Sequence, residues 1–235
     1  MKIIAGNWKM NGTAAQLDEM IAAVSNVATR ARVILCVPYT LLRAGGANIM
    51  IAAQNVSKFD AGAHTGDVSA AQVRATGATA TLVGHSEARA ALGDTNADVA
   101  MRAQNAINND LMPIICVGET DVERDLGRAA DVVRRGVRES VPQNAKDGEF
   151  IIAYEPRWAI GRGITPTAPQ IMDMHKIIRE TLDEMGFDNT PVLYGASVTA
   201  QNVRDIINIK NVDGVLVGGA SLKKQDFIPI IENAE

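Results

Sequence analysis

The sequence lacks the features that would link it to nucleic acids or membranes. Its 23 Lys and Arg residues are outnumbered by 27 Asp and Glu residues, and a net charge of −4 excludes a generally basic surface for phosphate backbones. The uncharged run 44–57 is shorter than the roughly 18 apolar residues that a membrane span needs, and the N-terminus lacks the apolar segment of a signal peptide. We therefore expect a soluble, cytoplasmic protein with no nucleic-acid or membrane partner.

Cysteine is also scarce, and no residues have the spacing of metal ligands. The two cysteines, Cys36 and Cys116, each lie inside an apolar run, which is typical of reduced core thiols and not of disulfide halves. No group of His, Cys, Asp and Glu residues has metal-ligand spacing, and the single G-x-G at 161–163 is not a dinucleotide fingerprint. We expect neither a metal nor a nucleotide.

What the sequence does contain is a regular alternation of apolar runs and amphipathic stretches. Eight short runs are apolar almost throughout, as strands of a parallel sheet covered on both faces are. They are KIIAGNW, RVILCV, NIMIAAQ, ATATLVG, MPIICVG, EFIIAYE, TPVLYG and DGVLVGG. Helical patterns lie between them, at 14–29, 97–110, 122–141, 169–186 and 200–207. The alternation predicts an α/β fold, a (β/α)₈ TIM barrel in a single domain over residues 1–235, although a doubly wound open sheet alternates in the same way.

In such a barrel the chemistry gathers at the C-terminal ends of the strands. Lys9 follows the first run, His85 the fourth and Glu155 the sixth. Each of these residues alone has an ordinary structural explanation, as a solvated lysine, a core histidine or a capping glutamate. Together on one face they form an acid/base set beside a fixed positive charge. Asn7, Gln54, Asn55 and Glu119 also follow strand runs.

The last two strand ends have the composition of an anion site. Gly218 and Gly219 lead into a predicted short helix, whose first N–H groups have no partner within the helix, and Ser197 adds a hydroxyl. Loops after the seventh and eighth strands frequently bind phosphate in this fold. The pattern favours a phosphorylated small molecule as the ligand; two ordinary tight connections are the alternative.

The segment AYEPRWAIGRG, 153–163, is unusually apolar for a loop. Glycines Gly161 and Gly163 and the proline Pro156 bracket it. An apolar segment that closes over Glu155 would exclude water from a reactive intermediate, so one interpretation is a lid. The other is a loop docked permanently on the rim, with Trp158 as packing.

Four blocks along the chain resemble the triosephosphate isomerase family, in its order and near its spacing. They are GNWKMNG at 6–12, VGHSEAR at 83–89, AYEPRWAIGRGITPT at 153–167 and LVGGASL at 216–222. The resemblance implies an isomerase of glycolysis and gluconeogenesis that interconverts dihydroxyacetone phosphate and glyceraldehyde 3-phosphate through an enediolate, without a cofactor.

The resemblance also implies roles for individual residues. Glu155 would be the base, His85 would polarise the carbonyl oxygens, Lys9 would supply positive charge, and Asn7 would be a partner on the oxyanion side. The residues implied for substrate phosphate are Gly161, Ser197, Gly218 and Gly219, and those for the lid and its support are Pro156, Trp158, Ala159, Ile160, Tyr194, Ser86 and Glu87. Ser86, as a helix cap, and Glu87, as a first-turn acid, would place His85 at the positive end of a helix, which favours a neutral imidazole.

Several positions depart from the family pattern. Arg157 stands where a small apolar residue is usual, Arg162 and Ile164 change the far end of the lid, and Ala196 replaces a glycine. Two other departures lie in the family's charge cluster near its subunit interface, where Ala88 replaces an arginine and Asp67 replaces a glutamate. The altered lid and Ala196 prompt an alternative, an isomerase for a four-carbon sugar phosphate. A barrel that serves only as a binding protein is a further alternative, although it would not need Asn7, Lys9, His85 and Glu155 together.

Residues 62–70, GAHTGDVSA, resemble the family's dimer loop, with Thr65 at the tip. We therefore expect a homodimer formed through this loop. His64 stands where an aromatic residue is common, as an interface packing residue or as a pH-sensitive group.

Overall fold

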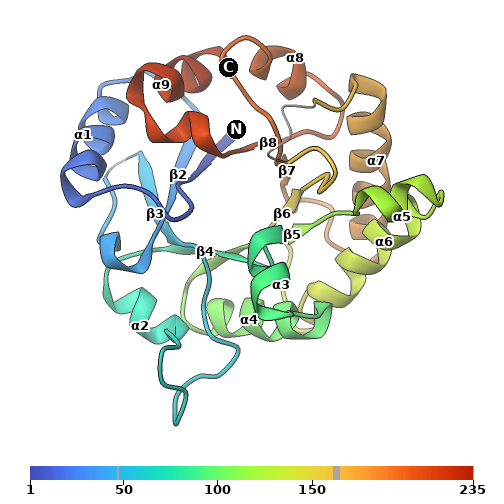
Figure 1. Ribbon diagram of the computed structural model, residues 1–235, viewed down its shortest axis with the longest axis horizontal. Helices are drawn as coiled ribbons and strands as arrows, with labels where there is room; N and C mark the ends of the chain where they lie inside the picture. Colours follow the sequence, from blue (N-terminus) through green and yellow to red (C-terminus); the bar gives the residue numbers. More distant parts are fainter. Residues whose placement is uncertain (47, 161–164, 235) are drawn as a thin grey trace.

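The predicted (β/α)₈ barrel is confirmed by the computed structural model, which describes residues 1–46, 48–160 and 165–234. Figure 1 shows the helices arranged in a ring around the strands. The strands in the described residues are β1 (Ile3–Asn7), β2 (Arg32–Val37), β3 (Ile49–Ala53), β4 (Ala80–Val83), β5 (Met112–Val117), β6 (Ile151–Tyr154), β7 (Val192–Tyr194) and β8 (Gly214–Val217). Each lies within one of the apolar runs of the sequence.

The helices connect successive strands and close the chain after the last one. They are α1 (Ala14–Ser25), α2 (Ala70–Ala75), α3 (Ser86–Leu92), α4 (Asn96–Asn108), α5 (Asp121–Asp125), α6 (Ala129–Ser140), α7 (Ala168–Glu184), α8 (Val203–Ile207) and α9 (Lys224–Asn233), with 3₁₀ turns η1 (Tyr39–Leu41) and η2 (Gly219–Leu222). Within the described residues, no helix combines the length and the apolarity needed to cross a membrane.

The pairing of the first strand excludes the doubly wound open sheet. β1 pairs in parallel with β2, with Asn7 opposite Cys36, and also with β8, where Gly6 lies opposite Val217. An open sheet would leave one side of β1 or of another strand unpaired, whereas here every neighbour is joined in a closed ring. Closure brings the C-terminal ends of all the strands to one rim.

Two apolar cores hold the barrel together. A large one lies between the strands and the helices, and a smaller one fills the barrel interior, where Cys36 and Cys116 are both buried and both free thiols. Burial raises the pKa of Cys36 to about 12, which keeps it a protonated thiol. The predicted reduced core cysteines are therefore confirmed.

The predicted helix bounds need correction at several places. The pattern at 122–141 is two helices, α5 and α6, because Gly127 adopts a left-handed φ of 71° that no continuous helix allows. The first helix ends at Ser25 and not at 29, since Asn26 caps it, and the eighth begins only at Val203. The patterns at 97–110 and 169–186 correspond to α4 and α7, which start at the capping boxes of Thr95 and Thr167. α2 and α9 were not predicted from the sequence.

Candidate active site

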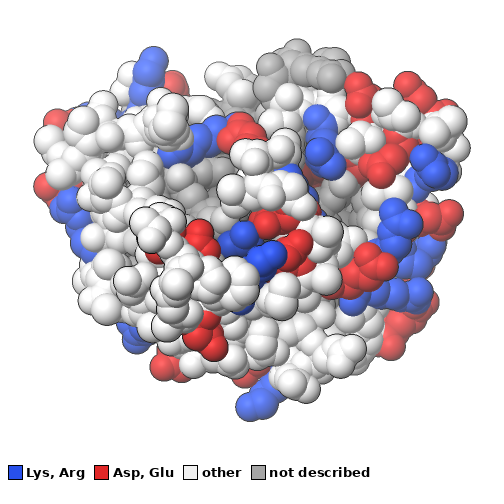
Figure 2. Space-filling model, turned by 60° about the horizontal axis from the view of Figure 1, so that its bottom comes forward, with Lys and Arg blue, Asp and Glu red and all other residues white. Residues whose placement is uncertain are grey.

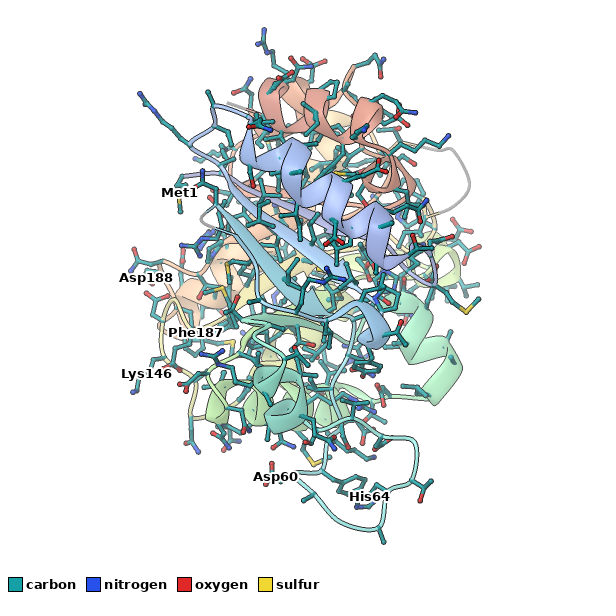
Figure 3. The ribbon with its side chains drawn as sticks, turned by 90° about the vertical axis from the view of Figure 1, so that its left-hand side faces the viewer. Met1, Asp60, His64, Lys146, Phe187 and Asp188 are labelled. Carbon is teal, nitrogen blue, oxygen red and sulfur yellow. The ribbon has the colours of Figure 1, made fainter. Side chains whose placement is uncertain are left out.

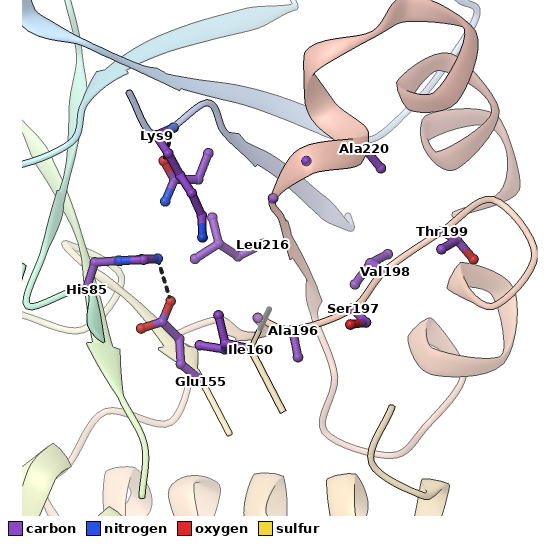
Figure 4. A pocket seen from close by; sticks show the side chains of 14 residues that line it. Lys9, His85, Glu155, Ile160, Ala196, Ser197, Val198, Thr199, Leu216 and Ala220 are labelled. Atoms are coloured by element: carbon purple, nitrogen blue, oxygen red, sulfur yellow. Dashed lines mark hydrogen bonds and ion pairs between the residues drawn. The ribbon is translucent and has the colours of Figure 1, made fainter. Parts of the chain in front are cut away.

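A pocket of about 320 Å³ opens at the rim formed by the C-terminal ends of the strands. It brings together residues from both halves of the chain. Its lining is Asn7, Lys9, His85, Glu155, Ile160, Gly195, Ala196, Ser197, Val198, Thr199, Leu216, Gly218, Gly219 and Ala220. Figure 4 shows Lys9, His85 and Glu155 at one end and Ser197, Thr199 and Ala220 at the other. The structure thus places the predicted acid/base set and the predicted anion site in one cavity.

Glu155 and His85 are in direct contact. The imidazole Nε2 lies 3.0 Å from Glu155 Oε1, and the backbone N–H of Ser86 donates to Oε2 at 3.0 Å. Both side chains are buried, Glu155 with 3% of its surface exposed and His85 with 7%. Burial alone would raise the pKa of Glu155, but the contact with His85, the Ser86 N–H and the charge of Lys9 outweigh it and lower the pKa below its ordinary value. The carboxylate is therefore held ionised, as a base must be.

The hydrogen bond at the other ring nitrogen decides the tautomer of His85. The backbone N–H of Glu87 donates to Nδ1 at 3.2 Å, so Nδ1 accepts and carries no proton, and the proton is on Nε2. Burial lowers the pKa of His85, whereas Glu155 raises it and gives a net upward shift. Protonation of Nδ1 would break the bond from Glu87, so we assign a neutral imidazole that donates from Nε2 into the pocket.

His85 itself is the N-cap of α3, which corrects the predicted cap at Ser86. The imidazole accepts the N–H of Glu87, and Ser86 becomes the first helical residue, its own N–H free to bind Glu155. Glu87 is the first-turn acid, as expected. A cap formed by the imidazole orients the ring and fixes its proton at the same time.

Both the backbone and the ammonium group of Lys9 make specific contacts. Its φ of 51° is left-handed, an uncommon conformation for a lysine, and its N–H donates to Asn7 Oδ1 at 3.0 Å. Gln54 donates to the Lys9 carbonyl at 2.8 Å, and the ammonium Nζ lies 2.6 Å from Glu87 Oε1. Asn7 and Gln54 thus shape the turn that directs the ammonium to the pocket, a role for Gln54 that the strand-end position alone did not reveal.

The backbone around Glu155 is fixed by the neighbouring strand. Its N–H donates to the Val117 carbonyl at 2.8 Å, and a Cβ on Gly118 would stand 1.7 Å from the Glu155 carbonyl oxygen. Only glycine permits this approach at position 118. Glu155 is therefore positioned by β5 as much as by its own strand.

The segment after Glu155 is anchored on Glu119, which is fully buried. Its Oε1 accepts from Trp158 Nε1 at 2.8 Å, from Arg124 Nη1 at 2.7 Å and from the Tyr154 hydroxyl at 3.1 Å. The Arg124 guanidinium also lies 4.7 Å from the Trp158 ring. Glu119 was noted only as a strand-end acid; its role as the anchor of this segment depends on contacts between elements that sequence reasoning did not bring together.

The other residues predicted for a lid divide between the core and the pocket. Pro156 and Ala159 are buried, with the Ala159 N–H donating to the Pro156 carbonyl at 2.8 Å, and Ile160 lines the pocket. Gly161 lies outside the described residues, as do Arg162 and Ile164. Tyr194 is fully buried at the end of β7, and its hydroxyl has no hydrogen-bond partner in the described parts of the chain.

The predicted anion end is formed by two backbone turns and one hydroxyl side chain. η2 begins at Gly219, as the predicted short helix after β8, and the Ser221 N–H donates to the Gly218 carbonyl at 2.8 Å. Ser197 lies opposite on the loop that follows β7 (Figure 4). No group of three or more His, Cys, Asp or Glu residues suited to a metal ion occurs in the residues that the structure describes. Leu216 and Val198 also line the pocket and were not predicted.

A family model, "Triosephosphate isomerase", matches residues 2–234. The chain belongs to the triosephosphate isomerase family. A triosephosphate isomerase from Jannaschia sp. (strain CCS1) is 45% identical over 98% of this chain and 96% of its own, and one from Ruegeria pomeroyi is 43% identical over 100% and 97%. The crystal structure of triosephosphate isomerase from Bartonella henselae superposes with a TM-score of 0.90 at 36% identity, covering 99% of this chain and 98% of that one.

These findings confirm the predicted family and enzyme class. Members of the triosephosphate isomerase family are isomerases, so the alternative of a barrel that only binds is wrong for this chain. An isomerase for a four-carbon sugar phosphate is not favoured, because the relatives reported above carry the triosephosphate isomerase name. The altered residues Arg157 and Ala196 are therefore variations within the family.

Proposed function

We propose that this chain interconverts dihydroxyacetone phosphate and glyceraldehyde 3-phosphate, as a step of glycolysis and gluconeogenesis and without a cofactor. The observation that carries the proposal is the contact of an ionised, buried Glu155 with a neutral His85, at 3.0 Å, in a pocket that also contains Lys9. Abstraction of a proton next to a carbonyl needs a base on one side and preset donors on the other. This site has both.

In the proposed reaction Glu155 removes a proton from the carbon beside the substrate carbonyl. The electron pair of the broken C–H bond forms the double bond of an enediolate, and negative charge develops on the carbonyl oxygen. The Nε2–H of His85, the ammonium of Lys9 and the amide of Asn7 stabilise that oxygen. The proton of the neighbouring hydroxyl passes to the former carbonyl oxygen, and Glu155 returns its proton to the adjacent carbon, so atoms and electrons balance with no oxidant or metal.

The other end of the pocket would bind the phosphate group. Ser197 supplies a hydroxyl, and Gly218 and Gly219 present backbone without side chains. The space beside Gly219 is open, because no atom lies within 4 Å of a Cβ built there. Backbone N–H groups at the start of a short helix suit an anion. By family resemblance Gly161 would add a donor there. We propose these four residues as the phosphate site, and Pro156, Trp158, Ala159 and Ile160, supported by Tyr194, Ser86 and Glu87, as the lid and its supports.

The assignment is tested by a coupled assay of glyceraldehyde 3-phosphate isomerisation on the purified protein and on its Glu155→Gln variant. Loss of the base should lower kcat by about 10²–10⁴-fold. Glu232→Gln, an exposed glutamate on α9, is the matched control and should leave kcat unchanged. Near-full activity in Glu155→Gln would show that another group is the base.

We further propose that residues 1–235 function as one domain in a cytoplasmic homodimer, with residues 62–70 at the interface. Figure 3 shows the loop that carries Asp60 and His64 standing out from the barrel. Every residue from 59 to 67 is exposed, and the rings of Phe59 and His64 stack at 3.9 Å, which stiffens the projection. A stiff, exposed projection is suited to insertion into a second copy of the chain.

A further inference from the structure

A second hollow lies outside the substrate pocket, beside the segment that follows Glu155. It consists of an outer bowl of about 640 Å³ and an inner recess of about 140 Å³. Both are lined by Arg89, Asn96, Arg135 and Arg157, so the two volumes adjoin. We call the pair the hinge recess, because Arg157 is the second residue after the base. Three arginines around one hollow are notable in a chain with a net charge of −4.

The three guanidiniums differ in their hydrogen-bond and ion-pair partners. Arg89 donates to the carbonyls of Gly84 and Cys116 and to the side chains of Asn96 and Ser140. By contrast, neither Arg135 nor Arg157 has a hydrogen bond or ion pair from its guanidinium to any residue in the described ranges.

The two arginines without such partners, Arg135 and Arg157, differ in their exposure to solvent. Arg135 is exposed on α6, whereas Arg157 is half-buried. Burial lowers the pKa of Arg89, and the positive charge of Arg157 lowers it further. Arg89 and Arg157 therefore lie close enough for their charges to oppose one another, and the charge of Arg157 also acts to lower the pKa of Glu123.

Three carboxylates also face the hinge recess, and each already has a partner. Asp94 pairs with Arg102 at 2.9 Å, and Glu139 accepts from Asn96 at 2.8 Å. Glu123 accepts the N–H and the hydroxyl of Thr120 in the capping box of α5. None of them makes an ion pair within 4.0 Å with Arg135 or Arg157 in the described residues, so the donors of both guanidiniums remain open.

We propose that the hinge recess is a second anion site, which binds a phosphate-sized oxyanion between Arg135 and Arg157. A guanidinium presents several N–H donors in a planar fork that matches the oxygens of a phosphate. Asn96, which lines both volumes, adds a polar side chain to the wall. The ligand class is inorganic phosphate or the phosphate group of a small metabolite.

This site is separate from the substrate pocket but adjoins the base. The linings of the two cavities have no residue in common. Gly118 forms part of the recess wall, and it packs directly on the carbonyl of Glu155. An occupant of the hinge recess would thus lie beside Gly118, which approaches the carbonyl of Glu155, and beside Arg157, the second residue after Glu155, without entering the pocket.

Calorimetric titration with inorganic phosphate, at fixed ionic strength and without any phosphorylated metabolite, tests the proposal. The titration should resolve two sites, and Ser197→Ala, which weakens phosphate binding in the substrate pocket, should leave binding at the hinge recess unchanged. Arg135→Gln and Arg157→Gln should each weaken this binding at least tenfold. Arg134→Gln is the matched control, since it removes the same charge from α6 but pairs with Asp131 and does not line the recess.

Because Arg135 is exposed, its variant should fold even where that of Arg157 does not. Absence of a second saturable phosphate site in the native sequence would overturn the proposal. So would equal weakening in Arg134→Gln, which would mean a diffuse charge effect. The comparison among arginine variants does not depend on catalysis, and a failure of the proposed isomerisation would be seen separately in the assay of Glu155→Gln.

Discussion

His175, on α7, illustrates what burial does to a single titratable residue. The imidazole is fully buried against Tyr154 and Tyr194, with ring centroids 5.8 and 6.5 Å away. Nδ1 contacts the Asn211 carbonyl at 3.0 Å, which assigns the proton to Nδ1. Burial lowers the pKa of His175 to about 4. The residue therefore has a structural role, and it makes stability depend on pH.

The sign of that dependence follows from the two pKa values. The unfolded chain takes up a proton at His175 near pH 6.5, whereas the folded protein resists it down to about pH 4. Stability is thus fully present above pH 6.5 and is lost as the pH falls. Urea unfolding should show a loss of about 2 kcal/mol from this group between pH 7 and pH 5.

His175→Gln provides the control for that measurement. It removes the titration and should flatten the dependence by the same amount, at a fixed protein concentration. An equal slope in both proteins would mean that His175 is not the group responsible.

At the scale of elements, one buried carboxylate joins two strands, a short helix and the start of the lid. Glu119 follows β5, and it binds Arg124 on α5, Tyr154 on β6 and Trp158 in the segment after the base. All three contacts are made by Oε1, and Oε2 has no hydrogen-bond partner in the part of the chain that the structure describes. A carboxylate in a low-dielectric environment is costly, so these contacts stabilise it only as a set. The geometry of the first turn after Glu155 therefore depends on the charge of Glu119.

Glu119→Gln should destabilise the protein by about 3 kcal/mol, because it leaves the Arg124 guanidinium without its counter-charge. The same substitution at Glu184, whose carboxylate pairs with Arg138 on the exposed surface, should cost less than about 1 kcal/mol. Denaturant unfolding of both variants compares the two. Similar losses of unfolding free energy in the two variants would show that burial does not set the contribution of Glu119 to stability.

At the scale of the whole molecule, charge and shape are unevenly distributed. Figure 2 shows Lys, Arg, Asp and Glu side chains crowded along the side of α5, α6 and α7, at the right of the view, and sparser elsewhere. The projecting loop at 59–67 has only two charged side chains, Asp60 and Asp67, and Asp67 accepts from Ser57 at 2.7 Å. An interface with few unpaired charges is easier to bury.

If residues 62–70 insert into a second copy, an arginine at the loop tip should oppose assembly. Thr65→Arg would bury an unpaired charge and should raise the dimer dissociation constant by about 100-fold or more, measured by analytical ultracentrifugation. Gln143→Arg adds the same charge at an exposed position in the connection that enters β6, at the other end of the barrel, and should leave the constant unchanged. A monomeric native protein would contradict the proposed homodimer.

Much of this protein was determined by local sequence pattern. Apolar runs that are buried on both faces, and amphipathic stretches between them, predicted the strands and the alternation of a barrel. Strand ends such as Lys9, His85 and Glu155 were predicted as one site because every parallel strand of a barrel ends at the same rim.

Only the tertiary structure decided what depends on contacts between distant segments. The pairing of β1 with β8 separates a closed barrel from an open sheet, and the imidazole cap of α3 sets the proton of His85. The anchor at Glu119 depends on Tyr154 and Trp158, which lie 35 and 39 residues away, and the hinge recess brings Arg135 of α6 near Arg157 of the segment after β6. Periodicity reports only which face of an element is buried, whereas the partner across that face is chosen by packing and electrostatics in three dimensions.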